Sequence, residues 1–124
     1  MPTHNIVSMS GGKDSTATLL VARELEVPNL SAVVADTGHE HPETYDYIHY
    51  LAEATGVPSR WVKADVSRQI AGKRKFIETK WREKGVAESV VLGALEVLHP
   101  TGNPFLDLCL WKGRFPSTQT RACT

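Results

Sequence analysis

A glycine-rich hexapeptide near the N-terminus has the residue types and the context of a phosphate-binding loop. It comprises Ser10, Gly11, Gly12, Lys13, Asp14 and Ser15, after an apolar run and before a stretch with apolar residues at helical spacing. A strand that passes through two glycines into a helix gathers unbonded backbone N–H groups and the positive end of the helix dipole around one point. Glycines also permit a close approach of ligand to backbone that a Cβ would block. The loop is therefore predicted to bind phosphate groups.

The other side chains of this loop have predicted roles of their own. Ser10 and Ser15 add hydroxyl donors at its rim, and Lys13 either contacts an outer phosphate or is solvated. We expect Asp14 to be the N-cap of the following helix or, alternatively, to help hold a magnesium ion carried by a nucleotide. The loop is not a Walker motif, because Val7 occupies the first glycine position and Asp14 follows Lys13. A kinase-like interpretation is therefore excluded.

A second candidate site follows the next apolar run of the chain. Asp36, Thr37 and Gly38 close a stretch that is rich in β-branched residues. At the end of a second parallel strand, such residues can reach the nucleoside of a nucleotide whose phosphates lie at the end of the first strand. The alternative is a plain turn, since aspartate and glycine are common turn residues. The nucleoside-binding interpretation is favoured.

The C-terminal segment carries a further anion-binding candidate and both cysteines. Lys112, Arg114 and Arg121 flank a glycine- and proline-containing loop, and guanidinium groups match the oxygens of sulfate or phosphate. A solvated basic surface is an equally good interpretation. Cys109 lies on the apolar side of a short helical pattern and is predicted to be buried and inert. Cys123 is the better candidate for a reactive, catalytic thiol, because Arg121 favours its thiolate form.

Two other patterns are assigned no chemistry. His39 and His41 have a spacing that suits a metal, but no further ligands stand near them and Pro42 explains the local order. The basic run within residues 73–84 is interleaved with glutamates and is predicted to be a solvated helix face. Nucleic-acid binding is not favoured, since Trp81 is the only aromatic support for it.

These candidates require a framework of strands that alternate with helices. The pattern predicts strands at 5–10, 30–35 and 60–64, with the third near a sheet edge, and helices at 15–26 and 42–56. This alternation predicts an α/β fold with a mainly parallel sheet covered by helices on both faces. From residue 65 onward the pattern is helical, with helices expected at 68–84, 87–98 and 104–111.

Bulk composition limits the alternatives. The 124 residues, of which 41% are hydrophobic, suit one compact domain over 1–124. The 14 basic and 14 acidic residues balance, so no overall field favours nucleic acid or an anionic membrane. Two cysteines and no signal-peptide pattern favour the reducing cytoplasm. The longest apolar stretch, 89–98, is too short to span a bilayer.

Three segments resemble one known family. The SGGKDS motif of residues 10–15 resembles the PP-loop of adenine nucleotide α-hydrolase-like proteins. The segment ADTGHEHPETY, residues 35–45, is similar to the second motif of the phosphoadenosine phosphosulfate (PAPS) reductase branch of that superfamily. Residues 109–124 are similar to a KGRFPS and R-x-C-T segment of reductase-like proteins common in phages and mobile elements. The resemblance therefore spans almost the whole chain.

The resemblance implies a Rossmann-like sheet of about three to five strands and an adenine nucleotide, PAPS or ATP, across the ends of the first two strands. Reductases of this family transfer the sulfonate to a cysteine in a C-terminal tail, and a thioredoxin-type thiol then releases sulfite. That cysteine motif is not found here, so the domain is expected to lack such a tail. Other relatives adenylate a substrate with ATP and magnesium.

Three functions are thus left open, namely sulfonucleotide reduction, adenylation and nucleotide binding without catalysis. No metal cluster is expected within the chain, and its sequence leaves the formation of homo-oligomers open.

Overall fold

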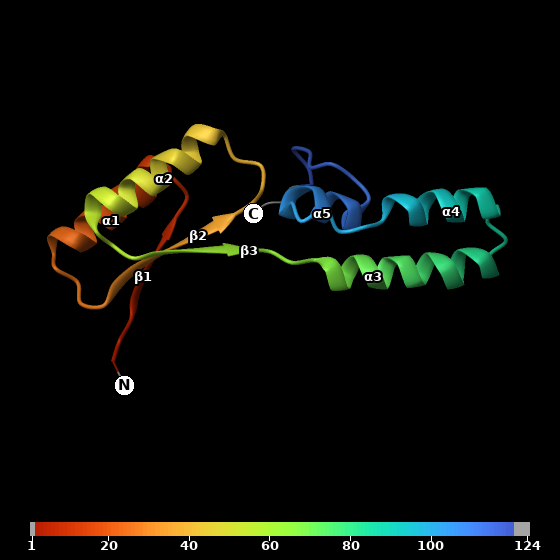
Figure 1. Cartoon of the computed structure of the whole chain (residues 1–124), viewed down its shortest axis with the longest axis horizontal. Coiled ribbons are helices and arrows are strands. Elements are labelled where there is room, and N and C mark those ends of the chain that lie inside the picture. Colours follow the sequence, from red (N-terminus) through yellow and green to blue (C-terminus); the bar gives the residue numbers. More distant parts are fainter. Residues whose placement is uncertain (1, 121–124) are drawn as a thin grey trace. The chain divides into compact units, whose positions relative to one another are not determined.

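A computed structural model describes residues 2–120 (Figure 1). The chain divides into two compact units, residues 1–63 and residues 64–124. Each unit has a buried hydrophobic cluster of its own. The expectation of one nucleotide-binding domain over residues 1–124 stays a prediction.

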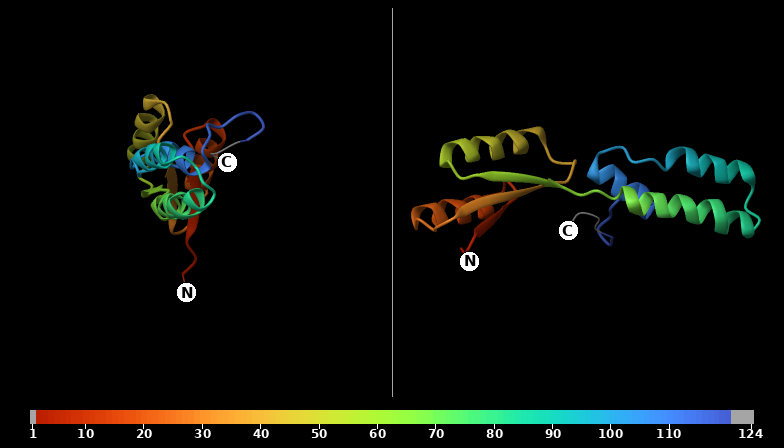
Figure 2. Two further views of the ribbon diagram at one scale, coloured as in Figure 1. Left: turned by 90° about the vertical axis from the view of Figure 1, so that its right-hand side faces the viewer. Right: turned by 60° about the horizontal axis from the view of Figure 1, so that its bottom comes forward.

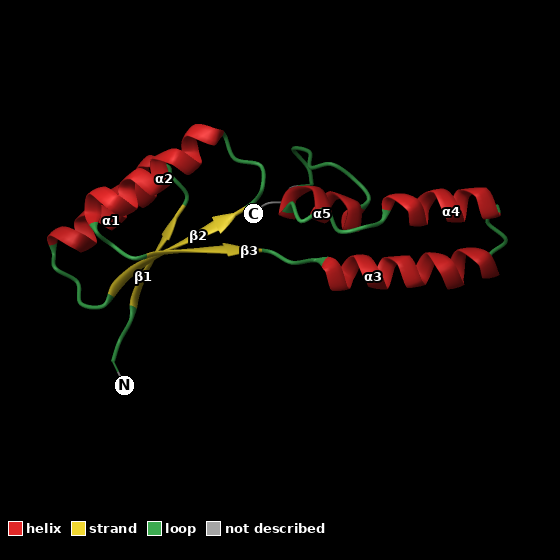
Figure 3. Ribbon diagram, in the orientation of Figure 1, coloured by secondary structure: helices red, strands yellow, loops and turns green. Residues whose placement is uncertain are grey.

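The first unit is a parallel sheet with helical crossovers. Its elements in chain order are β1 (Asn5–Met9), α1 (Lys13–Glu24), β2 (Leu30–Asp36), α2 (Pro42–Thr55) and β3 (Ser59–Lys63). The three strands are parallel and lie in the order β1-β2-β3 (Figure 3). Val7 pairs with Ala32, and Val34 pairs with Trp61. The predicted α/β class with a Rossmann-like parallel sheet is therefore confirmed.

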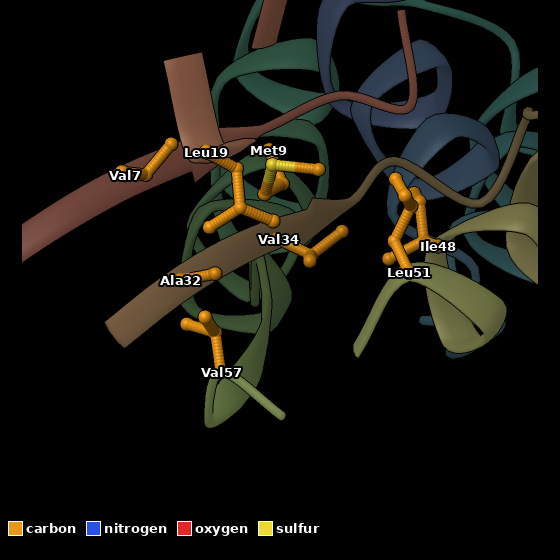
Figure 4. Packing of buried hydrophobic residues seen from close by; sticks show 8 residues of the cluster. All are labelled: Val7, Met9, Leu19, Ala32, Val34, Ile48, Leu51 and Val57. Atoms are coloured by element: carbon orange, nitrogen blue, oxygen red, sulfur yellow. The ribbon is translucent and has the colours of Figure 1, made fainter. Parts of the chain in front are cut away.

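One face of this sheet forms the core of the unit. Alternate residues of a strand point to the same face, so Val7 and Met9 of β1 lie beside Ala32 and Val34 of β2. Figure 4 shows them together with the helical and loop side chains of the same cluster, which are Leu19, Ile48, Leu51 and Val57. The nearly complete burial of Leu19, at 1% exposure, shows how closely α1 covers the sheet.

The opposite face differs from the expectation of helices on both faces. Both α1 and α2 contribute to the cluster on the first face, whereas Ile6 and Val62 on the other face are 61% and 41% exposed. The strand order gives the reason. Two successive right-handed crossovers that step in one direction along a sheet place both helices on the same side. Among residues 2–63, no helix covers the second face.

The ends of the two covering helices follow local chemistry. Gly56, with φ of +69°, ends α2 in the left-handed conformation that glycine adopts readily. His41 is the N-cap of α2, and its Nδ1 accepts a 3.3 Å hydrogen bond from the Glu43 amide, with Pro42 at the first helical position. His41 thus has a capping role in the α2 entry loop.

The second unit is helical, as its sequence pattern predicts. It contains α3 (Ser67–Phe76), the π-helical segment η1 (Ile77–Trp81), α4 (Glu88–Val97) and α5 (Pro104–Lys112). Figure 2 shows α4 alongside the continuous α3–η1 helix. Its hydrophobic cluster of buried side chains consists of Val66, Ile70, Ile77, Val91, Leu95 and Leu98. Residues 64–120 contain no strand.

Candidate functional site

The glycine-rich loop connects β1 directly to the start of α1. Strand β1 ends at Met9, and the N-cap of α1 is Gly12, with φ of −81° and ψ of 169°. No side chain caps this helix start. The first-turn amides of Lys13, Asp14 and Ser15 have no acceptor within the helix, because such amides lack a preceding turn. The predicted cluster of unbonded N–H groups therefore has the required backbone arrangement.

The two serines at the rim of the loop are brought together. Ser10 Oγ and Ser15 Oγ lie 3.2 Å apart, and Ser10 Oγ accepts a 3.4 Å hydrogen bond from the Gly12 amide. The Ser15 hydroxyl donates to the Gly12 carbonyl at 3.2 Å, and so does Thr16 Oγ1 at 2.8 Å. These short-range bonds tie the end of β1 to the first turn of α1.

The expected N-cap role of Asp14 is wrong. The helix begins at Lys13, two residues before the predicted start, so Asp14 occupies the second helical position and Gly12 the cap. A carboxylate in the first turn still interacts favourably with the helix dipole. Lys13 and Asp14 are both exposed, and neither forms an ion pair within residues 2–120.

Gly11 holds the loop against α2. Its φ is +82°, and a Cβ added there would lie 2.9 Å from Thr44 Cγ2 and 3.3 Å from Ile48 Cγ1. Both the backbone angle and the close approach therefore require glycine. Gly12 differs, because a Cβ there would meet only Ser10 Oγ, at 3.5 Å. Contacts with Thr44 were not predictable from the sequence, since they depend on how α2 packs.

The predicted nucleoside-binding turn follows β2 immediately. Asp36 is the last residue of β2, and its Oδ1 accepts hydrogen bonds from the Gly38 amide at 2.9 Å and from Tyr45 Oη at 2.8 Å. These two bonds, with the Tyr45 bond contributing most, lower the pKa of Asp36 despite its partial burial. Thr37 Oγ1 donates to Glu40 Oε1 at 3.1 Å. The turn is thus tightly bonded.

The two candidate loops lie at the same end of the sheet, where the strands have their carboxyl ends. Strands β1 and β2 are parallel neighbours, with Met9 opposite Val34, so residues 10–15 and residues 36–38 both follow carboxyl ends of adjacent strands. Neighbouring strands are about 4.8 Å apart. Ligands of open α/β sheets bind outside such carboxyl ends. The structure therefore brings together the two sites that the sequence separates by about 20 residues.

Aromatic side chains beside Asp36 are a feature that the sequence pattern does not predict. The Tyr45 and Trp61 rings are stacked with centroids 5.8 Å apart, and His49 stacks on Trp61 at 5.0 Å. Tyr45 and His49 are on α2 at an i, i+4 spacing, and Trp61 is on β3. That spacing places two residues on one helix face, but it does not indicate which strand residue they meet.

The C-terminal candidates lie in the second unit. Lys112 ends α5, and its Nζ lies 4.2 Å from the centroid of the Trp111 ring. Arg114 is exposed and borders a cavity of about 580 Å³ that is lined mainly by apolar side chains. Cys109 is buried, as predicted. Arg121 and Cys123 lie outside the described residues.

The basic run of the second unit is only partly a solvated face. Lys73 Nζ donates to the carbonyls of Leu110 and Trp111, both at 3.0 Å, and Arg74 donates to the carbonyls of Leu95 and Leu98. Carbonyls in the last turn of a helix lack partners within it, and cationic side chains satisfy them. Two members of the run are therefore structural.

Metal-binding clusters and membrane-spanning helices are both absent from residues 2–120. Within residues 2–120, no three His, Cys, Asp or Glu side chains gather closely enough to hold a metal ion. None of the helices in that range is both long and apolar enough to cross a bilayer.

The chain is similar to known proteins over the region that contains both loops. The family model for the phosphoadenosine phosphosulfate reductase domain matches residues 4–93. An uncharacterized 37.8 kDa protein in the gpa 5′ region of Escherichia phage 186 is 54% identical over 131 residues, which cover 98% of this chain and 39% of that relative. A phosphoadenosine 5′-phosphosulfate reductase of Alteromonas mediterranea is 34% identical over 67 residues, covering 54% of this chain and 27% of that enzyme.

The match thus covers well under half the length of either relative. The matched region contains β1, α1, β2, α2 and β3, and with them both candidate loops. The chain therefore belongs to the phosphoadenosine phosphosulfate reductase domain family.

Proposed function

We propose that this chain binds an adenine nucleotide at the carboxyl ends of β1 and β2. Residues 10–15 hold the phosphates, and residues 36–38 contact the nucleoside. The observation that carries the proposal is the start of α1, where Gly12 is the cap, no side chain occupies the first-turn amides, and the whole loop lies within the family match. Backbone amides and a helix dipole at one point attract a phosphate strongly.

The proposed reaction is reduction of a sulfonucleotide, PAPS, with a thiol as electron donor. A thiolate attacks the sulfur of the sulfonate group, the bond between sulfur and the phosphate oxygen breaks, and the nucleotide leaves with its electron pair. The product is an S-sulfonate, in which the thiol sulfur is bonded to the sulfonate sulfur. A second thiolate attacks the thiol-derived sulfur, the bond to the sulfonate breaks, and sulfite leaves with its electron pair as the disulfide forms. The chain's own contribution is electrostatic, because the loop amides stabilise the charge that develops on the departing phosphate.

The source of the thiol distinguishes this reaction from its alternative. Cys109 is buried, and burial makes it a poor nucleophile. We propose Cys123, or a thioredoxin-type partner, as the donor, and Lys112, Arg114 and Arg121 as anion-binding residues. The burial of Cys109 also favours a second candidate, adenylation of a substrate by ATP, which consumes no thiol.

In the adenylation reaction, an oxygen of the acceptor attacks the α-phosphate and pyrophosphate leaves from the loop. The Asp14 carboxylate is exposed and is the only carboxylate of the loop, so it is the proposed oxygen ligand for a magnesium ion that accompanies ATP. Such an ion supplies positive charge at the phosphates. A nucleotide-binding module without catalysis remains the third candidate, to be recognised by binding without turnover.

The test is calorimetric titration of the wild-type chain and of Gly12→Val with ATP and with PAPS. A Cβ at position 12 fits the loop but occupies the space in which a phosphate would meet the amides. We expect the wild type to bind at least one of the two nucleotides and the variant to bind about 100-fold more weakly or not at all. Sulfite release with added thiol, or pyrophosphate release with ATP, then separates the reactions.

The matched control is Gly93→Val, since a Cβ at this glycine of α4 meets no neighbour within 4 Å. It should bind nucleotide like the wild type. Equal affinity of Gly12→Val and wild type would show that the phosphates bind elsewhere.

A further inference from the structure

The carboxylate of Asp36 is bonded asymmetrically. Both of its hydrogen bonds, from Tyr45 Oη at 2.8 Å and from the Gly38 amide at 2.9 Å, reach the same oxygen, Oδ1. No residue between 2 and 120 donates a hydrogen bond to Oδ2. A carboxylate oxygen has two lone pairs and acts only as an acceptor when the group is ionised. One oxygen is therefore fixed, and the other is available to a donor from a ligand.

Tyr45 is itself held in place. Its ring stacks on Trp61 with an angle of 21° between the planes, and Trp61 stacks in turn on His49 at 26°. Trp61 also packs against the buried cluster of the first unit. A ring confined in this way keeps its hydroxyl in one direction, so the bond to Asp36 costs little additional ordering.

The electrostatic surroundings keep Asp36 ionised and Tyr45 protonated. The Tyr45 hydroxyl, the Gly38 amide and the Lys63 ammonium on the adjacent strand β3 lower the pKa of Asp36. Burial, the hydrogen bond to Asp36 and the negative charges of Asp36 and Glu40 raise the pKa of Tyr45, and a backbone hydrogen bond involving Glu40 offsets part of that rise. These are the charged groups that face the pair from the preceding turn and from β3.

From this arrangement we infer that Tyr45 is a positioning residue for the nucleoside. It holds one oxygen of Asp36 so that the other accepts a hydrogen bond from a ribose hydroxyl of the bound nucleotide. The inference rests on the proposed nucleotide site, because Asp36 must lie beside a ligand whose phosphates occupy residues 10–15. A carboxylate repels phosphates, so the donors it can meet are the ribose hydroxyls and the adenine amino group.

The ribose is the nearer of these two donors. The Asp36 turn and the phosphate loop follow neighbouring parallel strands, and the ribose is the part of a nucleotide attached directly to its phosphates. The adenine amino group lies at the far end of the base. Tyr45 thereby acts through Asp36 and does not touch the ligand.

The experiment compares Tyr45→Phe with the wild type in calorimetric titrations. The ligand is whichever of ATP and PAPS the wild type binds more tightly, with 2′,3′-dideoxy-ATP or 2′-deoxy-PAPS as the analogue that lacks the hydroxyl. We expect the substitution to weaken binding of the parent nucleotide about tenfold and binding of the deoxy analogue less than about twofold. Tyr45→Phe should weaken the binding of inosine triphosphate, which lacks the adenine amino group, as much as it weakens the binding of ATP.

Tyr50→Phe is the matched control. It makes the same change on the same helix, at a side chain that is 62% exposed and whose ring stacks on Tyr47 instead of Trp61. It should leave every affinity unchanged. In Asp36→Asn, adding Tyr45→Phe should cause no further loss, since the carboxylate that Tyr45 positions is gone.

The pH dependence of nucleotide affinity separates this positioning role from a purely structural one, because a purely structural role would leave it unchanged. Loss of the Tyr45 hydroxyl removes the main cause of the lowered pKa of Asp36, so protonation occurs at a higher pH. The acid side of the nucleotide-affinity profile should therefore shift upward in Tyr45→Phe and not in Tyr50→Phe.

Three results would overturn the role of Tyr45. They are an equal loss of affinity for parent and deoxy nucleotides, no loss at all, and a smaller loss of affinity for inosine triphosphate than for ATP. If Gly12→Val abolishes binding while Tyr45→Phe changes nothing, the nucleotide site stands and only this inference fails. If the wild type binds neither ATP nor PAPS, both fail.

Discussion

Gly11 and Gly12 are adjacent and chemically identical, but their neighbours give them different tasks. Gly11 has a positive φ and faces Thr44 and Ile48 of α2, so its missing side chain is a requirement of the fold. Gly12 has an ordinary φ of −81° and open space beside it. Its missing side chain is instead a requirement of the proposed ligand. At the scale of single residues, stability and function are thus separable within one loop.

This separation predicts unequal effects of alanine on stability at the two positions. Gly11→Ala should lower the free energy of unfolding by about 1–3 kcal/mol, because a left-handed backbone and a 2.9 Å contact are both unfavourable for a Cβ. Gly12→Ala should change it by less than about 0.5 kcal/mol. Urea unfolding followed by circular dichroism measures both. Equal losses would contradict the different roles.

Asp107 supports a pH prediction. Burial raises the pKa of Asp107, but hydrogen bonds from Thr101 Oγ1 and N, both at 2.7 Å, and from the Gly102 amide outweigh it, so the net shift is downward. A carboxyl with a lowered pKa in the folded state stabilises the fold above its unfolded pKa of about 4, and this contribution is lost as pH falls through the folded value.

Asp107→Asn should therefore be less stable than the wild type near pH 7, and the difference should shrink as pH falls below about 4. Urea unfolding at several pH values between about 3 and 7 measures this. A constant difference over that range would show that the carboxylate charge of Asp107 contributes nothing.

At the scale of elements, periodicity was enough to find every strand and helix of the described chain, because buried faces impose periods of 2 and 3.6 residues. Boundaries that depend on backbone angles were less predictable. The start of α1 at Lys13 moved the cap from Asp14 to Gly12. Partners that depend on packing between elements, such as Tyr45 for Asp36, left no signal in the local pattern.

The basic run illustrates the same limit. Interleaved charges indicate a solvated helix, but they do not show that Lys73 reaches the end of α5. Because this ammonium satisfies two helix carbonyls, Lys73→Met should destabilise the chain by about 1.5–3 kcal/mol. Lys75→Met, at an exposed position of the same helix, should have almost no effect. Chemical denaturation compares the two, and similar midpoints would argue against the capping role.

At the scale of the whole molecule, the overall charge balance conceals two unequal halves. Residues 1–63 contain four Lys or Arg and eight Asp or Glu, whereas residues 64–124 contain ten and six. The proposed phosphate site therefore lies in the acidic half. Local dipoles and Lys13 must attract the nucleotide there, since the net charge of that half does not.

The two hydrophobic clusters predict that the halves respond separately to core mutations. Ile70 is completely buried in the second cluster, and Ile70→Ala should cost about 2–5 kcal/mol. Hydrogen exchange should then accelerate in residues 64–120 while the amides of β2 keep their protection. Ile6→Ala, at a 61% exposed position, is the control. Equal acceleration throughout would instead show one cooperative domain over residues 1–124.

The hydroxyl bonds that join Ser10, Gly12 and Ser15 have a kinetic consequence. A loop already fastened to the first turn of its helix loses little conformational freedom when an anion arrives, so association needs no slow isomerisation. Stopped-flow mixing with nucleotide should accordingly show a single phase whose rate rises linearly with ligand concentration.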